Sequence, residues 1–219
     1  MRQLIAASSL MEISPFLDKY HPGGNDTGDY PLNLSDNLLV MITGIGCPAT
    51  VFNLTCCLKE DGFDRVIQVG IAGSYNPLIK TGSLVEVFED RFADLGIDDR
   101  GSFLTIGEAD LQDSSDKISP YGRLVNPLAG VTGLPLASSI TVNTASGSEL
   151  MIGQRRSGFN PDTETMEGAA AFYVCFRMNV PVIQVRAISN LVEPRDKSKW
   201  ETKTAVEKLN KWLETFVIQ

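Results

Sequence analysis

Two apolar, strand-like runs each lead directly into a turn of small residues, and no other feature narrows the possible folds of this chain as much. Residues 38–43 run into Gly44-Ile45-Gly46, and residues 65–70 run into Ile71-Ala72-Gly73-Ser74. Residues 47–59 follow the first turn with apolar side chains at helical spacing. A strand, a glycine turn and a helix make a βα unit, and glycine lets a ligand approach the backbone closely. The pattern predicts an α/β fold.

Other segments extend this pattern along the whole chain. We predict further strands at residues 3–9, 83–88, 138–143 and 181–188. We predict a short helix near Met11 and helices at residues 147–156, about 167–178 and about 200–216. Residues 19–37 are expected to form a loop or hairpin, and residues 98–131 an irregular segment that covers one face. Several consecutive strands have no helix between them, so the sheet is expected to be mixed. The prediction is a single α/β domain over residues 1–219, with a central twisted mixed β-sheet flanked by helices.

The charge of the chain argues against several classes of partner. A formal net charge of −8 and a pI near 4.7 make nucleic acid and anionic membranes poor partners. Glu12 interrupts the apolar N-terminal segment too early for a signal peptide. No apolar run approaches the roughly 20 residues that span a bilayer. We therefore expect a cytoplasmic protein that binds neither nucleic acid nor membrane.

Cysteine and histidine offer little for metal or nucleophilic chemistry. The spacings of Cys47, Cys56, Cys57 and Cys175 fit no zinc site, and their apolar surroundings predict buried, reduced thiols. His21 is the single histidine, so a catalytic triad or a histidine-based metal site has almost nothing to be built from. The Gly-x-Gly turn lacks the third glycine of the dinucleotide fingerprint. We predict neither a metal nor an organic cofactor.

Two carboxylates stand where strands lead into helices. Glu12 lies just past the carboxyl end of the first strand, where open α/β sheets place ligands. Glu167 begins the helix of residues 167–178, and small residues follow it at once. An acidic side chain at a helix start is also stabilised by the helix dipole, so each carboxylate has a purely structural explanation as well. For Arg186, near the end of the last strand, the structural alternative is a salt bridge.

Taken together and in order, five short segments resemble the nucleoside phosphorylase/nucleosidase superfamily. They are residues 11–12, 44–46, 70–73, 166–170 and 185–190. The Met-Glu-x-Ala-Ala and Arg-Ala-Ile-Ser elements at their mutual spacing are fairly specific, whereas the glycine turns alone are not. The resemblance spans nearly the whole chain and is greatest to the 5′-methylthioadenosine/S-adenosylhomocysteine nucleosidases and the futalosine hydrolases. It implies a nucleoside phosphorylase-like fold and cleavage of an N-ribosidic bond.

The resemblance also implies roles for individual residues. In that superfamily the reaction passes through a ribosyl cation. Glu12 would then activate the attacking water, and Glu167 would bind the ribose hydroxyls and favour the positive charge on the sugar. Arg186 and the Met166 backbone would complete the ribose pocket. The other residues implied in binding or catalysis are Ala72, Gly73, Leu150, Met151, Ser189 and Asn190.

Two positions depart from the pattern of the relatives, and they bear on the nucleophile and the base. Phosphorylases of the superfamily carry a phosphate-binding arginine two residues before Gly70, where this chain has the neutral Gln68. Its loss favours water over phosphate. Asn190 stands where methylthioadenosine-type nucleosidases have an aspartate that protonates the base. An amide is no general acid, but it donates and accepts hydrogen bonds, which suits a 6-oxopurine better than adenine.

The expected reaction is therefore hydrolysis of futalosine to hypoxanthine and dehypoxanthine futalosine, as in menaquinone biosynthesis. The alternatives are a methylthioadenosine/S-adenosylhomocysteine-type nucleosidase, a purine nucleoside phosphorylase and a non-catalytic nucleoside-binding module. Residues 92–96 and 192–200 also resemble futalosine hydrolase and are expected to shape the pocket for the 5′ substituent. Candidates there are Arg91, Asp94 and Arg195, and for Arg195 an exposed salt bridge is the alternative. The superfamily further implies a homo-oligomer that acts on a small purine nucleoside.

Overall fold

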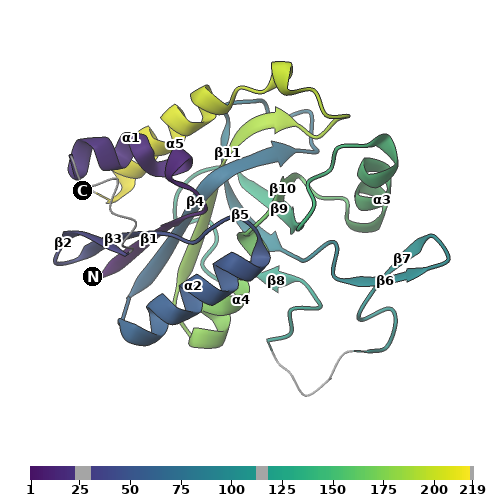
Figure 1. Ribbon diagram of the computed structural model, residues 1–219, viewed down its shortest axis with the longest axis horizontal. Coiled ribbons are helices and arrows are strands. Elements are labelled where there is room, and N and C mark those ends of the chain that lie inside the picture. The colour runs from purple at the N-terminus through teal and green to yellow at the C-terminus, as the bar shows by residue number, and fades with distance from the viewer. Residues whose placement is uncertain (23–30, 112–117, 218–219) are drawn as a thin grey trace.

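The computed structural model describes residues 1–22, 31–111 and 118–217. One large twisted sheet runs through the molecule, with helices on both of its faces (Figure 1). Its strands lie in the order β10, β9, β5, β11, β4, β1, β3, β2, and β8 pairs with β5. Their bounds are β1 Gln3–Ala7, β2 Leu32–Ser35, β3 Leu38–Ile42, β4 Arg65–Ser74, β5 Leu84–Asp90, β8 Leu124–Val125, β9 Leu136–Thr141, β10 Thr163–Thr165 and β11 Val182–Leu191.

The sheet is mixed, as predicted, and part of it closes on itself. β4 pairs in parallel with β1 and β11, and β9 pairs in parallel with β5 and β10. β5 runs antiparallel to β11. β10 also pairs antiparallel with the end of β4, through Thr163 with Ser74 and Glu164 with Gly73. The strands β4, β11, β5, β9 and β10 therefore form a closed ring, which the sequence pattern did not predict.

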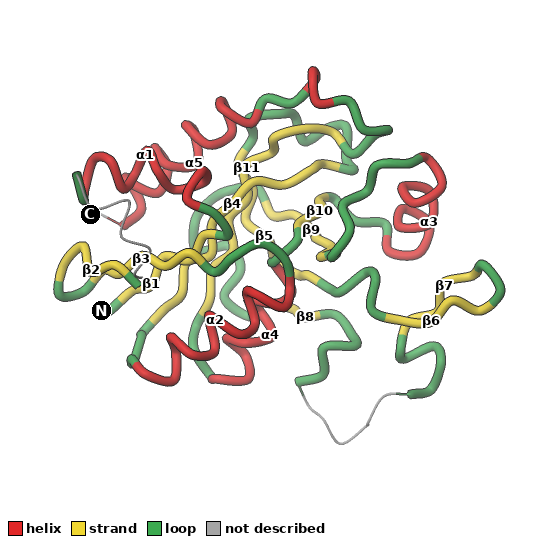
Figure 2. The backbone as a smooth tube through the Cα atoms, in the orientation of Figure 1, coloured by secondary structure: helices red, strands yellow, loops and turns green. Residues whose placement is uncertain are grey.

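Two pairs of helices cover the two faces of the sheet. α1 (Leu10–Tyr20) and α5 (Thr202–Val217) pack together on one face, and α2 (Cys47–Glu60) and α4 (Gly168–Met178) pack on the other (Figure 1). Each strand contributes side chains to the hydrophobic cores on both faces of the sheet, because successive side chains point to opposite faces. In β1, Leu4 and Ala6 are buried on the α2 and α4 side, whereas Ile5 and Ala7 are buried on the α1 and α5 side. α3 (Glu149–Phe159) lies beyond the β9 and β10 edge, and Figure 2 shows it joined to the sheet by loops.

Two predicted elements differ from the structure. Residues 71–74 were expected to form a turn, but they continue β4, because β11 and β10 lie alongside and supply partners for its backbone. Residues 98–131 were expected to be irregular and to cover one face. The described residues of this range instead contribute to a hairpin of β6 (Gly96–Asp99) and β7 (Ser102–Thr105) that projects to the side of the sheet (Figure 1), and they include β8. Residues 112–117 of the range lie outside the described residues. Of the predicted loop at residues 19–37, residues 23–30 lie outside the described residues.

The cysteines are not all buried. Cys47, Cys57 and Cys175 are buried, but Cys56 is exposed. Adjacent residues on α2 point in different directions, so Cys57 enters the core while Cys56 faces solvent. Burial raises the pKa of the Cys57 thiol to about 11. In the part of the chain that the structure describes, no helix is both long and apolar enough to cross a membrane.

Candidate active site

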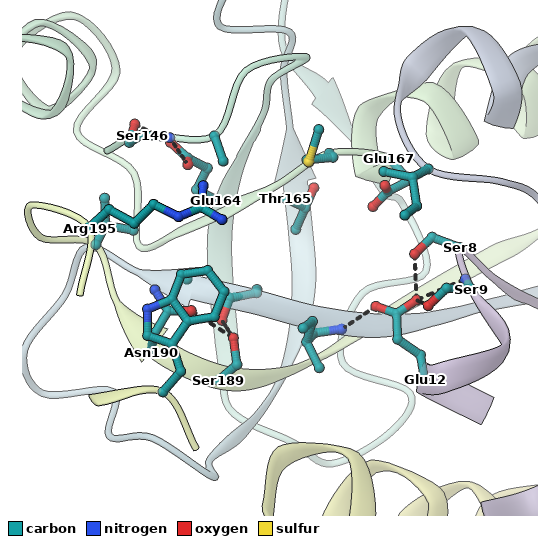
Figure 3. Close-up of a pocket in the computed structure, with 18 of the residues that line it drawn as sticks. Ser8, Ser9, Glu12, Ser146, Glu164, Thr165, Glu167, Ser189, Asn190 and Arg195 are labelled. Carbon is teal, nitrogen blue, oxygen red and sulfur yellow. Dashed lines mark hydrogen bonds between the residues drawn. The ribbon is translucent and has the colours of Figure 1, made fainter. Parts of the chain in front are cut away.

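A cleft of about 230 Å³ opens where the carboxyl ends of β1, β4 and β11 meet the starts of α1 and α4. Figure 3 shows Ser8, Ser9, Glu12 and Glu167 at one end and Ser146, Glu164, Asn190 and Arg195 at the other. We refer to these as the Glu12 end and the Asn190 end. The residues that line the cleft are Ser8, Ser9, Met11, Glu12, Ile45, Ile71, Ala72, Gly73, Ala145, Ser146, Glu164, Thr165, Met166, Glu167, Ser189, Asn190, Val192, Glu193, Arg195 and Trp200.

Glu12 is held in place through both of its carboxylate oxygens. It lies in the first turn of α1 with only 3% of its surface exposed. Oε2 accepts hydrogen bonds from the Ser8 hydroxyl and from the Ser9 N–H, the latter at 3.2 Å. Oε1 accepts from the Ile71 N–H at 2.9 Å. These donors fix the direction in which the carboxylate faces the cleft (Figure 3), as a positioned general base requires.

A buried amide from α5 supports the same turn of α1. Asn210 is 2% exposed, and its Nδ2 donates to the Glu12 carbonyl oxygen at 2.9 Å. Its Oδ1 accepts from the Phe16 N–H at 3.1 Å. In a regular helix these two backbone groups, four residues apart, bond to each other. The amide thus contacts the helix ladder beside Pro15 and ties the backbone of Glu12 to α5.

Glu167 occupies the N-cap position of α4, as its sequence position predicted. Its carboxylate does not cap its own helix: Oε1 instead accepts from the Gly46 N–H, at the start of α2, at 2.9 Å. The residue is 5% exposed. Burial raises the pKa of Glu167, and the nearby Glu12 charge adds to this, whereas Arg186 and the Gly46 N–H oppose it. The sequence predicted that Glu12 and Glu167 both lie near strand ends, and the structure places both in one cleft.

Arg186, which was expected to complete the ribose pocket, is not among the residues that line the cleft. Its side chain is fully buried on β11, where Nε donates to Gln184 Oε1 at 3.0 Å. A Cβ on Gly70 would lie 2.4 Å from Arg186 Nη1 and 2.9 Å from Glu12 Oε1, so the absent side chain at position 70 leaves room for both. Arg186 Nη2 has no hydrogen-bond partner among the described residues. A buried guanidinium N–H of this kind marks a place for an ordered water or a ligand.

Asn190 reaches the cleft because of an irregularity in β11. The register between β4 and β11 shifts between Ile188 and Asn190, which is how a bulge changes the direction of side chains. Asn190 Oδ1 accepts from the Ser189 hydroxyl at 2.7 Å, and its Nδ2 donates to the Leu191 carbonyl at 2.8 Å. The predicted Ala72 and Gly73 line the cleft beside it. The Asn190 end therefore offers a neutral amide against a backbone wall.

A buried polar cluster beside the Asn190 end was not predicted. Glu164 Oε1 accepts from the Ser146 N–H at 2.7 Å, and its Oε2 accepts from the Tyr75 hydroxyl at 3.1 Å. Arg155 Nη1 lies 3.3 Å from Glu164 Oε2. Burial raises the pKa of Tyr75 to about 12. Tyr75 is 89 residues from Glu164 in the sequence, so no local pattern could have linked them; the closure of β10 onto β4 brings them together.

Four predicted residues lie away from the cleft. Leu150 is 73% exposed on α3, and its neighbour Met151 lines a separate cavity with Phe159. Both were expected to line the base, and the structure places neither among the residues that line the cleft. Arg91 lies against Phe159, with its guanidinium carbon 5.6 Å from the ring centroid. Asp94 accepts from the Asn143 N–H at 2.5 Å. Neither lines the cleft.

Arg195, the third candidate for the 5′ pocket, does line the cleft, but at the Asn190 end (Figure 3). Its guanidinium carbon lies 5.5 Å from the centroid of the Trp200 ring. The salt bridge that was the alternative interpretation is absent among the described residues, since Asp196 instead caps the short helix Lys197–Lys199 through the Ser198 N–H. Arg195 therefore presents an unpaired cation to the cleft.

The comparisons with known proteins agree with this geometry. Residues 156–218 match the sequence model of the phosphorylase superfamily. Futalosine hydrolase from Thermus thermophilus is 30% identical over 171 residues, which are 76% of this chain and 75% of that protein. The chain belongs to the futalosine hydrolase family. Futalosine hydrolase from Streptomyces coelicolor is 31% identical over 150 residues, which are 67% of this chain and 62% of that protein.

The fold of the chain is similar to that of a solved structure. A futalosine hydrolase mutant from Helicobacter pylori superposes with a TM-score of 0.79 over 100% of this chain and 99% of that chain, at 18% sequence identity. The similarity covers the whole sheet and its flanking helices. The predicted resemblance to the superfamily and the predicted mixed α/β fold are both confirmed.

Proposed function

We propose that the protein hydrolyses the N-ribosidic bond of futalosine and releases hypoxanthine. The observation that carries this proposal is the pair of buried carboxylates, Glu12 and Glu167, at one end of a cleft whose other end holds the neutral amide of Asn190. Membership of the futalosine hydrolase family supports the choice of substrate.

The ribose is proposed to lie between the two carboxylates. Glu167 accepts hydrogen bonds from the ribose hydroxyls, and its charge stabilises the positive charge that develops on the sugar as the bond to the base breaks. Water attacks C1′, its proton passes to Glu12, and the electron pair of the C1′–N9 bond remains on the purine. Arg186 Nη1 and Glu12 Oε1 both lie beside Gly70, and Nη2 of the same guanidinium is unpartnered among the described residues, so this group is a donor that can hold the water.

Water rather than phosphate is the proposed nucleophile because of Gln68. The side chain is 3% exposed on β4, and its Oε1 has no hydrogen-bond partner among the described residues. A neutral, buried amide supplies no charge for a phosphate dianion. Among the described residues, the one Arg or Lys side chain that lines the cleft is Arg195, at the opposite end from Glu12.

The proposed base is a 6-oxopurine because Asn190 offers one donor and one acceptor. The amide can donate to the 6-oxo group and accept from a protonated ring nitrogen, whereas adenine presents the reverse pattern at the 6 position. Asn190→Asp should therefore lower the rate with futalosine and raise the ratio of adenine release to hypoxanthine release. A variant that keeps the substrate preference of the wild type would remove Asn190 from base recognition.

Product analysis of the wild-type protein tests the main proposal. The protein is incubated without phosphate with futalosine, inosine or methylthioadenosine, and free bases are measured by chromatography. Hypoxanthine from futalosine is expected; release of adenine alone, or a rate that requires phosphate, would point to one of the alternative activities. Glu12→Gln and Glu167→Ala should each lower kcat by about 100-fold or more if both carboxylates act in the transition state. Unchanged turnover in both variants would leave a nucleoside-binding module as the better description.

We further propose that the protein acts as a homo-oligomer, in which a second copy covers the Glu12 end. Met11 and Ile45 line the cleft there, yet 50% and 65% of their surfaces are exposed. Apolar side chains at the rim of a cleft are suited to contact with a partner. Light scattering after size-exclusion chromatography measures the mass directly, and a mass of one chain at micromolar concentration would contradict the proposal.

A further inference from the structure

We propose that Arg195 is a catalytic residue that stabilises the departing purine, a role that rests on the proposed nucleosidase activity. The sequence suggested Arg195 as a partner for the carboxylate at the 5′ end of the substrate. The geometry points to the base instead, because Arg195 lines the cleft at the Asn190 end, away from the two carboxylates that would hold the ribose (Figure 3).

The backbone and side chain of Arg195 are both positioned by neighbours. Its N–H donates to the Gly147 carbonyl at 3.2 Å, on the loop that also carries Ser146 of the cleft wall. Its guanidinium lies over Trp200, 5.5 Å from the ring centroid, in the range of a cation–π contact. The indole supports the planar head without neutralising its charge. Arg195 is exposed, so a substrate can reach it from the cleft.

Among the described residues that line the cleft, Arg195 is the one with a positively charged side chain. The other charged side chains that line the cleft are Glu12, Glu164, Glu167 and Glu193. Glu164 pairs with Arg155, and Glu193 pairs with Lys199 at 2.9 Å. No acidic side chain of the described residues forms an ion pair with Arg195, so its charge is available to a ligand.

The reaction needs such a charge at the Asn190 end. When the C1′–N9 bond breaks, the bonding electron pair remains on hypoxanthine, and the negative charge spreads over the ring nitrogens and the 6-oxo oxygen. Asn190 can hydrogen-bond to this anion but has no proton to give it. A guanidinium beside the 6-oxo oxygen and N7 lowers the energy of the anion as it forms. Solvent then protonates the released base, and the water that attacked C1′ supplies the sugar hydroxyl.

The same arrangement argues against pairing with the 5′ carboxylate. The base and the 5′ substituent leave the ribose ring from opposite sides of the ring oxygen. A ribose bound between Glu12 and Glu167 with its base toward Asn190 therefore directs its 5′ substituent away from Arg195. Met11 and Ile45, adjacent in sequence to Glu12 and Gly46, line that other side.

The test compares substrates that differ in one feature each. Arg195→Gln and Arg195→Lys are assayed with futalosine, with futalosine methyl ester, and with p-nitrophenyl riboside, whose leaving group needs no stabilisation. Arg195→Gln should lower kcat about 100-fold with futalosine and equally with the ester, and only a few-fold with p-nitrophenyl riboside. Arg195→Lys should recover part of the loss. Lys197→Gln, which removes a nearby charge that does not line the cleft, serves as the matched control and should keep the wild-type kcat.

Each other outcome overturns the proposal. A loss with futalosine but not with its methyl ester would assign Arg195 to the 5′ carboxylate, and an equal loss with all three substrates would assign it a structural role. A second measurement does not depend on turnover: hypoxanthine binding to the wild type, followed by calorimetry, should strengthen as pH rises and hypoxanthine ionises, and Arg195→Gln should abolish this dependence. If the wild type does not cleave futalosine, the proposed function fails, while hypoxanthine binding still tests Arg195.

Discussion

Replacement of Asn210 by alanine tests how far the fold itself positions the general base. The amide makes three buried hydrogen bonds, to the Phe16 N–H, the Glu12 carbonyl and the Val206 carbonyl, at 3.1, 2.9 and 2.7 Å. A buried backbone group that loses its partner costs ~1–3 kcal/mol. Two α1 groups are affected, so the upper bound for them is about 6 kcal/mol. They can also bond to each other as in a regular helix, so we expect a loss of ~2–4 kcal/mol in the free energy of unfolding.

The same substitution should reach the chemistry, because it removes the amide that ties the turn carrying Glu12 to α5. A displacement of about 1 Å in a catalytic group can lower the rate ~100-fold. We expect kcat for the nucleosidase reaction to fall at least about 10-fold, with KM changed much less, since the ribose contacts of Glu167 lie on another element. Urea unfolding gives the stability, and steady-state kinetics at a temperature where the variant remains folded give kcat and KM.

Lys211→Ala, an exposed change on the same helix, is the matched control and should alter stability by no more than about 0.5 kcal/mol. A variant of Asn210 that is destabilised yet keeps the wild-type kcat would show that α1 does not depend on this amide for the position of Glu12. Wild-type stability would show that the three hydrogen bonds contribute nothing net.

Three further predictions concern other parts of the site and the surface. Gly168→Ala should lower both stability and kcat, because the added Cβ would lie 2.1 Å from Asp90 Oδ2, at the residue that directly follows Glu167. Urea unfolding should show a loss of ~1–3 kcal/mol in the free energy of unfolding, and wild-type values would contradict the contact. Burial raises the pKa of Glu167, and its charged form is the active one. As the pH is lowered, kcat should therefore begin to fall at a higher pH than it would with a glutamate of ordinary pKa. A pH–rate profile that is flat down to pH 4.5 would refute this. Cys56 is the exposed thiol, so iodoacetamide should alkylate it first in the folded protein, and peptide mass spectrometry that finds Cys57 modified at the same rate would contradict the packing of α2.

The sequence was informative wherever a function depends on the ends of strands. Glu12 and Glu167 are 155 positions apart, yet each lies at the start of a predicted helix that follows an extended segment, where α/β folds place ligands. The mixed sheet followed from strands without helices between them. The glycine-containing segments indicated where the backbone lies close to the site, although residues 71–74 continue a strand rather than form a turn.

The rest depended on contacts between distant segments. Nothing local to Asn210 shows that its amide meets α1, because that contact exists only once both helices lie on the sheet. The β6–β7 hairpin was missed because Asp and Gly are poor strand formers. The positions of Leu150 and Met151 depend on where α3 lies beside the sheet, which no local sequence pattern indicates. Contacts with Trp200 and Gly147 set the position of Arg195 within the cleft, and no sequence motif indicates either contact.

The strands that continue into the floor of the cleft limit how such a protein can change its substrate over evolutionary time. Ala72, Gly73 and Asn190 are paired residues of β4 and β11 rather than members of a loop. Insertion of one residue there would turn every following side chain to the opposite face of the sheet and disrupt the core. New base preferences are therefore expected from exchange of side chains at these fixed positions, and changes in length are expected in α3 and in the β6–β7 hairpin, which lie outside the ring.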